Sequence, residues 1–276
     1  MRLFGDYHFH TAFSRDGHGT IDEAAAMAKE KNLKEIAITE HGPMVWSGVD
    51  RKNYAQIRAL CKTAEETHGV RVLMGLESNV ISADGKIDVT EDERGLFDIM
   101  LCGIHRTTKA ADFKSFWKFF LPNRFWSVIR WTPKGRIEKN TEVMKNVILN
   151  NKIDIWTHPN RYWKIDVVEV ARVCAERGTL MELNGKKISF RPIDFERSLA
   201  AGAKFIVNSD GHNREQLGRT AVVREFLELV DYRDGDIVNI GDYSFLDPDA
   251  PKGTGEPISH EDKSDADQSG KKWWAK

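Results

Sequence analysis

The sequence contains little of what holds a small secreted protein or a membrane protein together. Its only three cysteines are Cys61, Cys102 and Cys174, and no C-x-x-C pair is present. This excludes a disulfide framework and favours a reducing compartment. No run of about 18 apolar residues occurs, and the first residues become polar too early for a signal peptide. We therefore expect a cytoplasmic protein that makes no use of a membrane.

An excess of charge of one sign is also missing. The formal net charge is −1, from 41 Lys and Arg against 42 Asp and Glu. No bulk field therefore attracts nucleic acid or a lipid surface. Hydrophobic residues make up 41% and charged residues 30%, which excludes a disordered or fibrous chain. A length of 276 residues suits one (β/α) barrel.

Short apolar segments alternate with helical patterns along the chain. Predicted strands cover residues 6–10, 35–41, 71–79, 99–105, 154–159, 179–185 and 204–212. Predicted helices cover residues 20–32, 51–67, 140–150, 165–177 and 191–201. Strand-then-helix alternation predicts a parallel sheet, and seven such units suit a closed or nearly closed α/β barrel.

Histidines and carboxylates stand where these strands end. Eight of them close a predicted strand: His8, His10, His41, Glu77, His105, His158, Asp210 and His212. In a parallel barrel the carboxyl ends of all strands meet on one face, so these side chains converge on one pocket. Divalent zinc, manganese or iron would relieve the cost of desolvating so many ionisable groups together. The sequence therefore predicts a metal centre.

Each residue has a plainer explanation when it is taken alone. His8 and His10 can be two half-buried strand histidines, and His41 can be a turn histidine. On a regular strand His8 and His10 share one face, while Tyr7 and Phe9 point the other way. The number of histidines and carboxylates at the carboxyl ends of the predicted strands favours metal ligation over these explanations.

Four other residues near these motifs have candidate roles. Asp6 is a candidate carboxylate for orienting a ligand imidazole, with a surface acid as the alternative. In the loop after the first strand, Asp16 or His18 can add a ligand, and we favour Asp16. His68 stands near a helix end, where we expect a capping role.

These residues fall in motifs that resemble those of the PHP (polymerase and histidinol phosphatase) superfamily. The segment DYHFHTAFSRDG at 6–17 resembles the first motif. ITEHGP, MGLESN, GIHR, THPN, MELNG and NSDGH resemble the others, in order and at similar spacing. The chain is most similar to the YcdX-like stand-alone metal-dependent phosphatases. The resemblance implies a distorted (β/α)7 barrel with two or three divalent ions (Zn, Mn or Fe) at the carboxyl ends of the strands.

The resemblance also implies how nine residues divide among three ions. One ion takes His8, His10 and Asp210, a second takes His105 and His158 and shares a bridging Glu77, and a third takes Asp16, His41 and His212. In YcdX-like proteins a histidine stands in place of Asp16.

A centre of this kind suits hydrolysis at phosphorus. Metal ions lower the pKa of a bound water, which can attack in line, and Glu77 and Asp210 are the predicted catalytic residues at that water. No nucleophile elbow or Cys–His pair indicates a covalent intermediate. Arg106 and Arg161 follow ligand histidines and are predicted to hold phosphate, the alternative being exposed loop arginines. Further candidates are Lys186, Arg191 and Arg214.

Residues 107–140 form a predicted insertion with an unusual composition. The segment has eight aromatic residues and eight Lys or Arg against two acids. Its net charge of +6 leaves −7 for the rest of the chain. Three interpretations remain open: a flap over an anionic substrate, a helix packed on the barrel or a second subunit, and, more weakly, a membrane contact.

We therefore predict a barrel domain over 1–246 and a flexible tail over 247–276. The expected function is a metal-dependent phosphoesterase, and within that class a phosphomonoesterase acting on a small phosphorylated metabolite. Alternatives are a histidinol phosphatase, a nucleotide or nucleic-acid phosphodiesterase, and a non-catalytic metal-binding domain. An amidohydrolase is disfavoured, because its fourth strand would end in lysine where this chain has His105. Packing of the insertion on a second subunit leaves a homo-oligomer open.

Overall fold

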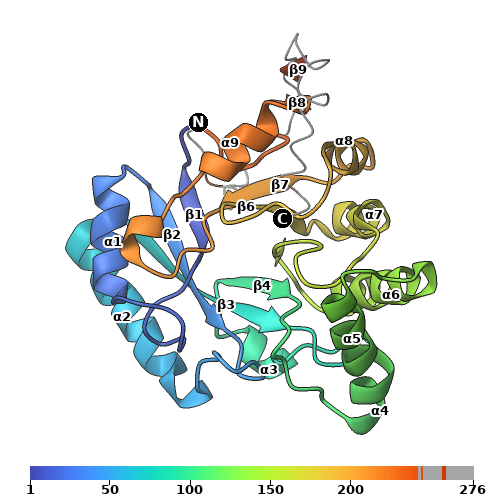
Figure 1. The fold of residues 1–276 in the computed structure, drawn as a ribbon. Helices are drawn as coiled ribbons and strands as arrows, with labels where there is room; N and C mark the ends of the chain where they lie inside the picture. The colour runs from blue at the N-terminus through green and yellow to red at the C-terminus, as the bar shows by residue number, and fades with distance from the viewer. Residues whose placement is uncertain (242–243, 245–256, 259–276) are drawn as a thin grey trace.

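Seven parallel strands form one sheet in sequential order (Figure 1). The computed structural model describes residues 1–241, 244 and 257–258. The strands are β1 (Gly5–Phe9), β2 (Glu35–His41), β3 (Arg71–Asn79), β4 (Ile99–Gly103), β5 (Ile155–Trp156), β6 (Leu180–Asn184) and β7 (Phe205–Asn208). The order β1 to β7 confirms the predicted barrel of strand-then-helix units.

The barrel is nearly closed between its first and last strands. Phe9 and Gly211 form a parallel bridge, and the His10 backbone N–H donates to the Gly211 carbonyl at 2.9 Å. At the other end of this seam Asn239 lies between the two strands, and its amide donates to the carbonyls of Gly5 at 3.0 Å and Val207 at 2.7 Å. The seam is thus held by a side chain that follows the last strand of the barrel.

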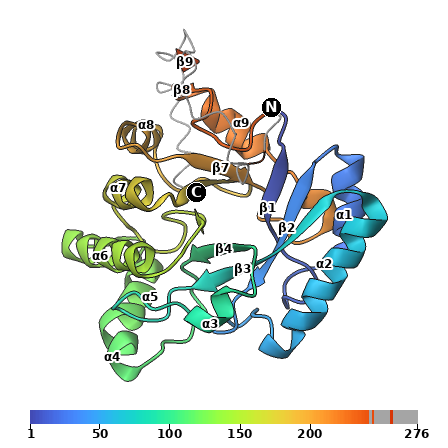
Figure 2. The ribbon, with the colours of Figure 1, turned by 180° about the vertical axis from the view of Figure 1, so that it is seen from behind.

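Helices surround the strands on the outside, as the two opposite views show (Figures 1 and 2). The α-helices are α1 (Ile21–Glu30), α2 (Tyr54–His68), α3 (Glu91–Arg94), α4 (Phe113–Ser115), α5 (Leu121–Ile129), α6 (Lys134–Asn150), α7 (Val167–Arg177), α8 (Pro192–Ala200) and α9 (Ala221–Leu227). Shorter turns are η1 (Arg51–Asn53), η2 (Phe116–Phe120) and η3 (Arg214–Gln216). Within the described residues, no helix is both long and apolar enough to cross a bilayer.

Local sequence signals set several of these helix ends. The Thr20 side chain accepts from the Glu23 backbone N–H at 3.1 Å, and Glu23 returns a bond to the Thr20 N–H at 2.7 Å. This capping box begins α1. Gly178 ends α7 with φ of 71°, a left-handed conformation that glycine adopts without strain.

Two hydrophobic cores alternate across the sheet. Outward-facing side chains such as Ile36 and Met100 pack against the helices. The inner core holds Tyr7, Ala37, Leu73, Ile99, Leu101, Ile155 and Ile206. The expectation that Tyr7 and Phe9 share one face is wrong: Phe9 packs in the outer core and Tyr7 in the inner one. The β1 register shifts between Asp6 and Phe9, and this irregularity breaks the alternation.

Other differences from the sequence predictions lie at element ends. Strands β5 and β7 are shorter than predicted, so the side chains that follow them belong to loops. The helix predicted at 140–150 begins at Lys134, inside the predicted insertion. Of the predicted tail, only Pro257–Ile258 is described, as β9 paired antiparallel to β8 (Tyr232–Arg233), and the remainder of 247–276 lies outside the described residues.

Candidate metal centre

The carboxyl ends of the barrel strands bring the nine predicted ligands together. His41 and Glu77 are direct neighbours in the register of β2 and β3. His10, His105, His158, Asp210 and His212 follow the ends of β1, β4, β5 and β7. Most of the nine are buried, whereas Asp16 and His212 are half-buried.

Glu77 is at the centre of the group. Its Oε1 lies 2.8 Å from His158 Nε2, 3.3 Å from His8 Nε2 and 3.4 Å from His105 Nε2. Its Oε2 lies 2.7 Å from His41 Nδ1. One fully buried carboxylate therefore meets imidazoles from four different strand ends. Glu77 could therefore contribute a ligand atom together with His41 and His105.

His8 and His10 turn the same ring nitrogen toward one point. Their Nε2 atoms are 3.1 Å apart, and Asp210 Oδ1 lies 3.9 Å and 3.8 Å from them. These three ligand atoms form one group that could hold an ion. Their grouping matches the first ion implied by the sequence resemblance.

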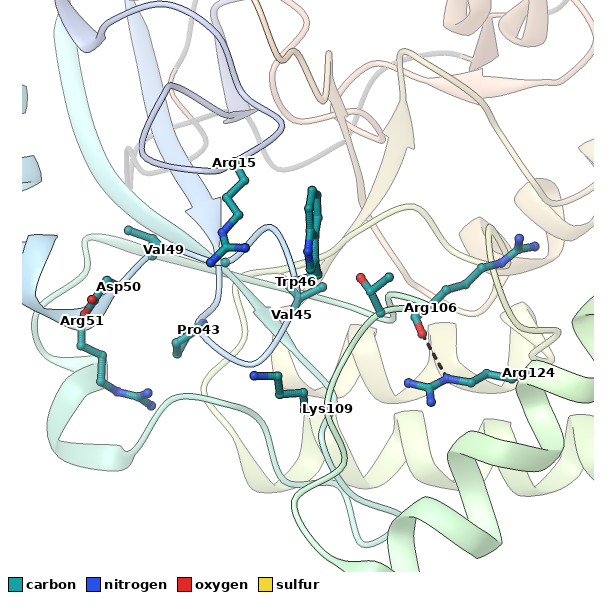
Figure 3. Close-up of a pocket in the computed structure, with 12 residues that line it drawn as sticks. Arg15, Pro43, Val45, Trp46, Val49, Asp50, Arg51, Arg106, Lys109 and Arg124 are labelled. Atoms are coloured by element: carbon teal, nitrogen blue, oxygen red, sulfur yellow. Dashed lines mark hydrogen bonds between the residues drawn. The ribbon is translucent and has the colours of Figure 1, made fainter.

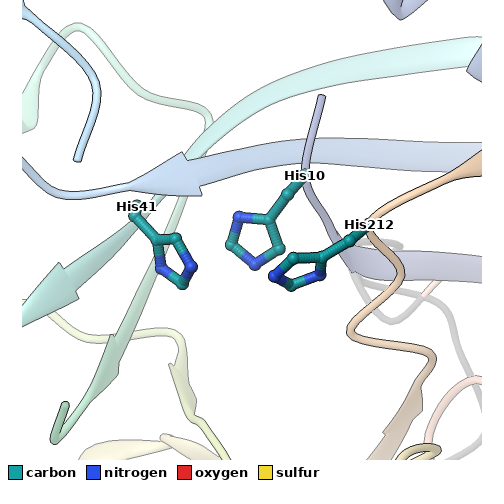
Figure 4. A group of neighbouring side chains, drawn as sticks. All are labelled: His10, His41 and His212. Atoms are coloured by element: carbon teal, nitrogen blue, oxygen red, sulfur yellow. The ribbon is translucent and has the colours of Figure 1, made fainter. Parts of the chain in front are cut away.

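A second cluster consists of the imidazoles of His10, His41 and His212 (Figure 4). The ring centroid of His10 is 4.1 Å from that of His41 and 4.4 Å from that of His212. Asp16 Oδ2 lies 3.4 Å from His41 Nε2 and 3.8 Å from His212 Nε2. Of the two loop candidates, Asp16 is therefore the one that reaches the cluster, while the His18 backbone N–H bonds to the His212 carbonyl at 2.7 Å.

The candidate ligand atoms suit binding of divalent ions better than hydrogen bonding among themselves. Among the described residues, four buried ligand atoms lack a hydrogen-bond partner: His10 Nδ1, Asp16 Oδ1, His41 Nδ1 and Glu77 Oε2. His41 Nδ1 and Glu77 Oε2 are close, yet their geometry does not form a hydrogen bond. Buried polar atoms left in this way are costly, and a cation between them removes the cost. An all-N/O set of this composition suits Zn, Mn or Fe.

Burial and neighbouring charges set the protonation of the histidines. Burial lowers the pKa of His105 to about 4, and burial together with His41 and His212 holds the pKa of His10 well below its usual range. Neutral imidazoles of this kind are competent ligands. Burial also acts against charge on His8, but Glu182 and Glu77 outweigh it and raise the pKa of His8. These carboxylates favour positive charge at this position, as a proton or as a metal ion.

Glu182 is a functional residue that sequence reasoning missed. Its Oε1 bonds to His8 Nδ1 at 2.7 Å, and its Oε2 accepts from the His158 backbone N–H at 2.7 Å. The role predicted for Asp6 is therefore wrong: the Asp6 carboxylate accepts from the N–H groups of Ser209 and Gly218 and joins β1 to the loops after β7. The MELNG motif that contains Glu182 was the signal that could have revealed it.

Two further side chains hold ligands in place. Asn79 Oδ1 lies 2.7 Å from His105 Nδ1, which leaves Nε2 of that ring facing Glu77. Lys186 Nζ lies 2.9 Å from both Asp210 Oδ1 and His212 Nδ1. The sequence proposed Lys186 only as a phosphate contact, whereas its place is beside these two candidate ligands.

Backbone strain is concentrated at the same site. His158 has φ of 31° and Asp210 has φ of 50°, in the left-handed region that non-glycine residues rarely adopt. Gly103 packs so closely on the next strand that an added Cβ would lie 2.4 Å from Thr157 Oγ1 and 2.8 Å from His158 Cε1. The fold thus holds these ligands in conformations that local preference disfavours.

The two predicted phosphate-binding arginines flank Tyr162. The guanidinium carbons of Arg106 and Arg161 lie 5.8 Å and 5.7 Å from its ring centroid. The same ring is 5.7 Å from His105 and 5.6 Å from His158. Arg161 Nη1 is buried and, as far as the structure describes the chain, has no hydrogen-bond partner. Both cations therefore stand beside the histidine cluster.

His68 is the last residue of α2, at the helix end where a capping role was predicted. Its Nε2 lies 2.7 Å from Asp22 Oδ1 of α1, so the ring joins two helices, and Gly69 ends α2. Its partner Asp22 is none of the candidate ligands, which makes His68 a suitable control position.

The insertion packs on the barrel and reaches the mouth of the site. Phe119 and Phe120 are buried, with ring centroids 5.0 Å and 5.4 Å from that of Trp163. Arg124 of α5 donates to the carbonyls of Arg106 at 3.1 Å and Thr108 at 2.8 Å. The inner side of the insertion therefore packs on the barrel, which is one of the three interpretations that the sequence left open.

Comparison with known proteins places the chain in a family. Residues 6–184 match the PHP domain. The chain therefore belongs to the PHP domain family, as its motifs predicted. A protein of Shewanella sp. (strain MR-4) that is named "probable phosphatase" is 28% identical to this chain over 257 residues. The match covers 90% of this chain and 92% of that protein. Another "probable phosphatase", from Proteus mirabilis (strain HI4320), is 27% identical over 251 residues, covering 88% and 92%.

A solved structure shows the same fold at low sequence identity. The histidinol phosphate phosphatase of Lactococcus lactis subsp. lactis Il1403, solved with zinc, L-histidinol and phosphate, matches with a TM-score of 0.51 and 14% identity. The match covers 82% of this chain and 94% of that one. It confirms the predicted barrel fold.

Proposed function

We propose that the protein is a metal-dependent phosphatase and, within that class, a phosphomonoesterase that acts on a small phosphorylated metabolite. Membership of the PHP domain family and the names of the curated relatives support the broader class. The observation that carries the proposal is the Glu77 carboxylate, which meets imidazoles from four strand ends beside a buried, unpaired Arg161 nitrogen. Such a site combines ligands for cations with a donor for phosphate.

The nine strand-end residues are the proposed ligands, and Glu77 and Asp210 are the proposed catalytic residues. Divalent ions would lower the pKa of a water and polarise the phosphoryl oxygens when bound. Glu77 would contribute to holding the ions, because each of its oxygens faces a different set of imidazoles. Glu182 and Asn79 fix which nitrogen of His8 and His105 faces the centre.

Arg161 and Arg106 are the proposed contacts to the phosphate. A guanidinium presents a planar fork of donors that matches two phosphate oxygens. Tyr162 keeps both guanidinium groups next to His105 and His158, because its ring contacts all four side chains. The phosphoryl group would thus be held between cations of the protein and the ligand cluster.

Metal analysis paired with a substrate screen tests this proposal. We expect at least two divalent ions per chain after metal-replete expression. We also expect hydrolysis of p-nitrophenyl phosphate and small phosphomonoesters, histidinol phosphate included, in preference to bis-p-nitrophenyl phosphate. Less than one ion per chain, or no hydrolysis of any ester by fully loaded protein, would overturn it. A clear preference for the diester would replace the monoesterase with a phosphodiesterase.

A further inference from the structure

A basic pocket is formed by loops that follow three of the barrel strands (Figure 3). Its volume is about 700 Å³, and loops that carry candidate ligands form its wall. Arg15 precedes Asp16, Pro43 follows His41 by two positions, and Arg106 follows His105. None of the nine candidate ligands lines the pocket, but each of these three loops carries one of them, so the pocket adjoins the proposed metal centre.

The pocket carries more positive charge than its own acids neutralise. Its lining includes one acid, Asp50, and five basic side chains: Arg15, Arg51, Arg106, Lys109 and Arg124. Arg51 bonds to Glu93 Oε1 at 2.5 Å, and Arg124 is bound to backbone carbonyls. Arg15, Arg106 and Lys109 have no carboxylate partner within the described part of the chain. Three exposed cations thus remain for an anion.

An aromatic surface stands among these cations. The Trp46 side chain is 61% exposed, although it belongs to an ordered loop in which Val45 and Val49 are buried. The guanidinium carbon of Arg15 lies 5.6 Å from the Trp46 ring centroid. The loop is fixed by bonds from the Val49 N–H to the His41 carbonyl at 2.9 Å and from Gly48 to Val45 at 3.1 Å. An exposed indole held in this way offers a flat surface on which a planar ring can stack.

We propose that this pocket is a second subsite, which binds a leaving group carrying a planar ring and a second anionic group. The inference rests on the proposed phosphatase activity and narrows its substrate to nucleotides with more than one phosphate. The reacting phosphate faces the metal centre and Arg161, so Arg15 and Lys109 are available to the other phosphate. Trp46 takes the ring.

Kinetics with three esters separate these contributions in the metal-loaded protein. Ribose 5-phosphate has neither feature, adenosine 5′-monophosphate adds the ring, and adenosine 3′,5′-bisphosphate adds a second phosphate. We expect kcat/KM to rise at least tenfold at each addition. Trp46→Ala should lower the values for both nucleotides, and Lys109→Gln should lower only that for the bisphosphate, each by about tenfold or more. Ribose 5-phosphate should change less than twofold in either variant.

The control is Lys62→Gln on α2, which removes an exposed lysine that does not line the pocket. Equal kcat/KM values for the three esters, or equal losses for all three in the variants, would overturn the subsite. If the wild type hydrolyses none of the esters, the phosphatase proposal fails and calorimetric binding of the bisphosphate decides the subsite. Binding that weakens tenfold in Lys109→Gln would support it, and unaltered or absent binding would overturn it.

A separate feature of the insertion carries a second inference. Its outer side exposes a stripe of large apolar side chains at helical spacing: Phe113, Trp117, Leu121, Phe125, Val128, Ile129 and Trp131. Phe113 and Val128 are 79% and 82% exposed. Helices α4 and α5 lie at the periphery in both views (Figures 1 and 2). A contiguous stripe of exposed apolar side chains marks a surface that contacts a membrane or another molecule.

The charges around the stripe indicate what covers it. Lys114 lies on α4, Lys118 lies on η2 and Arg130 directly follows α5. The acid before α4, Asp112, accepts hydrogen bonds from Ser115. A symmetric pairing of two copies through this stripe would bring like charges together. Tryptophan, phenylalanine and basic residues together are typical of helices that lie in the interface of an anionic bilayer.

We infer that the outer side of 113–131 docks on an anionic lipid surface. This takes up the weakest of the three sequence-based interpretations of the insertion, although the chain as a whole was expected to have no membrane partner. We expect the full chain to co-sediment with vesicles of phosphatidylglycerol and phosphatidylcholine, and at least tenfold less with phosphatidylcholine alone or in high salt. The double variant Trp117→Ser, Phe125→Ser should lose at least tenfold in binding. Leu60→Ser, at an exposed apolar position of α2, should bind as the wild type does.

Light scattering on the same variants tests the competing occupant. A monomeric wild type that binds anionic vesicles supports the lipid surface. A dimer that the double variant dissociates, or no binding to anionic vesicles, would overturn it and assign the stripe to a second copy or to another protein.

Discussion

Replacing Glu182 by glutamine should release metal from a site whose proposed ligands remain unchanged. Glu182 pairs its Oε1 with His8 Nδ1 and its Oε2 with the His158 N–H, each at 2.7 Å, and Asn184 donates to Oε2 at 2.9 Å. Burial acts to raise the pKa of Glu182, but the neighbouring His8 has the larger, opposite effect, so the pKa is lowered overall. The carboxylate is therefore ionised and can only accept hydrogen bonds. His8 must therefore donate through Nδ1, which leaves Nε2 free for an ion.

Glutamine cannot satisfy both sides of this position. If its oxygen faces His8, its NH2 group opposes the donors of His158 and Asn184. If its NH2 group faces His8, the imidazole proton moves to Nε2 and blocks the ligand atom. Changes of this kind typically reduce metal affinity about 10–100-fold. This corresponds to about 1.4–2.8 kcal/mol of binding free energy.

The assay is equilibrium metal content in a buffered series of free Zn²⁺, with kcat for p-nitrophenyl phosphate measured at saturating metal. The matched control is Glu35→Gln, since Glu35 is also buried but lies at the start of β2, at the opposite end of the barrel, where it accepts from Tyr7. Glu35→Gln should lower the melting temperature and leave metal affinity unchanged. Wild-type affinity in Glu182→Gln, or an equal loss in the control, would refute the reasoning.

Three other outcomes are expected. Glu77→Ala should abolish nearly all hydrolysis even at matched metal loading. The control His68→Ala removes one interhelical pair with Asp22 and should change kcat by less than twofold. Similar kcat values for the two variants would count against the assignment of Glu77. Gly103→Ala should lower both metal content and kcat, because the added Cβ would press on His158, and unaltered values in both assays would show that the strand can shift. Phe119→Ala should destabilise the fold by about 3–5 kcal/mol, as measured by urea unfolding, because the ring is buried against Trp163, and a change below 1 kcal/mol would place the ring outside the core.

The sequence by itself determined the architecture and the identity of the clustered residues. Strand-then-helix alternation predicts a parallel barrel, and in such a barrel the strand ends must meet. Histidines and carboxylates at those ends therefore had to converge, wherever each helix began. The motifs identified the family for the same reason, since they are the segments at the strand ends that carry these histidines and carboxylates.

Only the tertiary structure decided which side chains support the ligands. Glu182 and Asn79 are far in sequence from the rings they orient, so no local pattern pairs them with His8 and His105. The irregularity in β1 that turns Tyr7 inward arises from pairing with β2, and strand alternation alone cannot predict it. The insertion shows the same limit. Its composition revealed aromatic and basic residues, but packing against Trp163 decided that Phe119 is buried while Phe113 stays exposed.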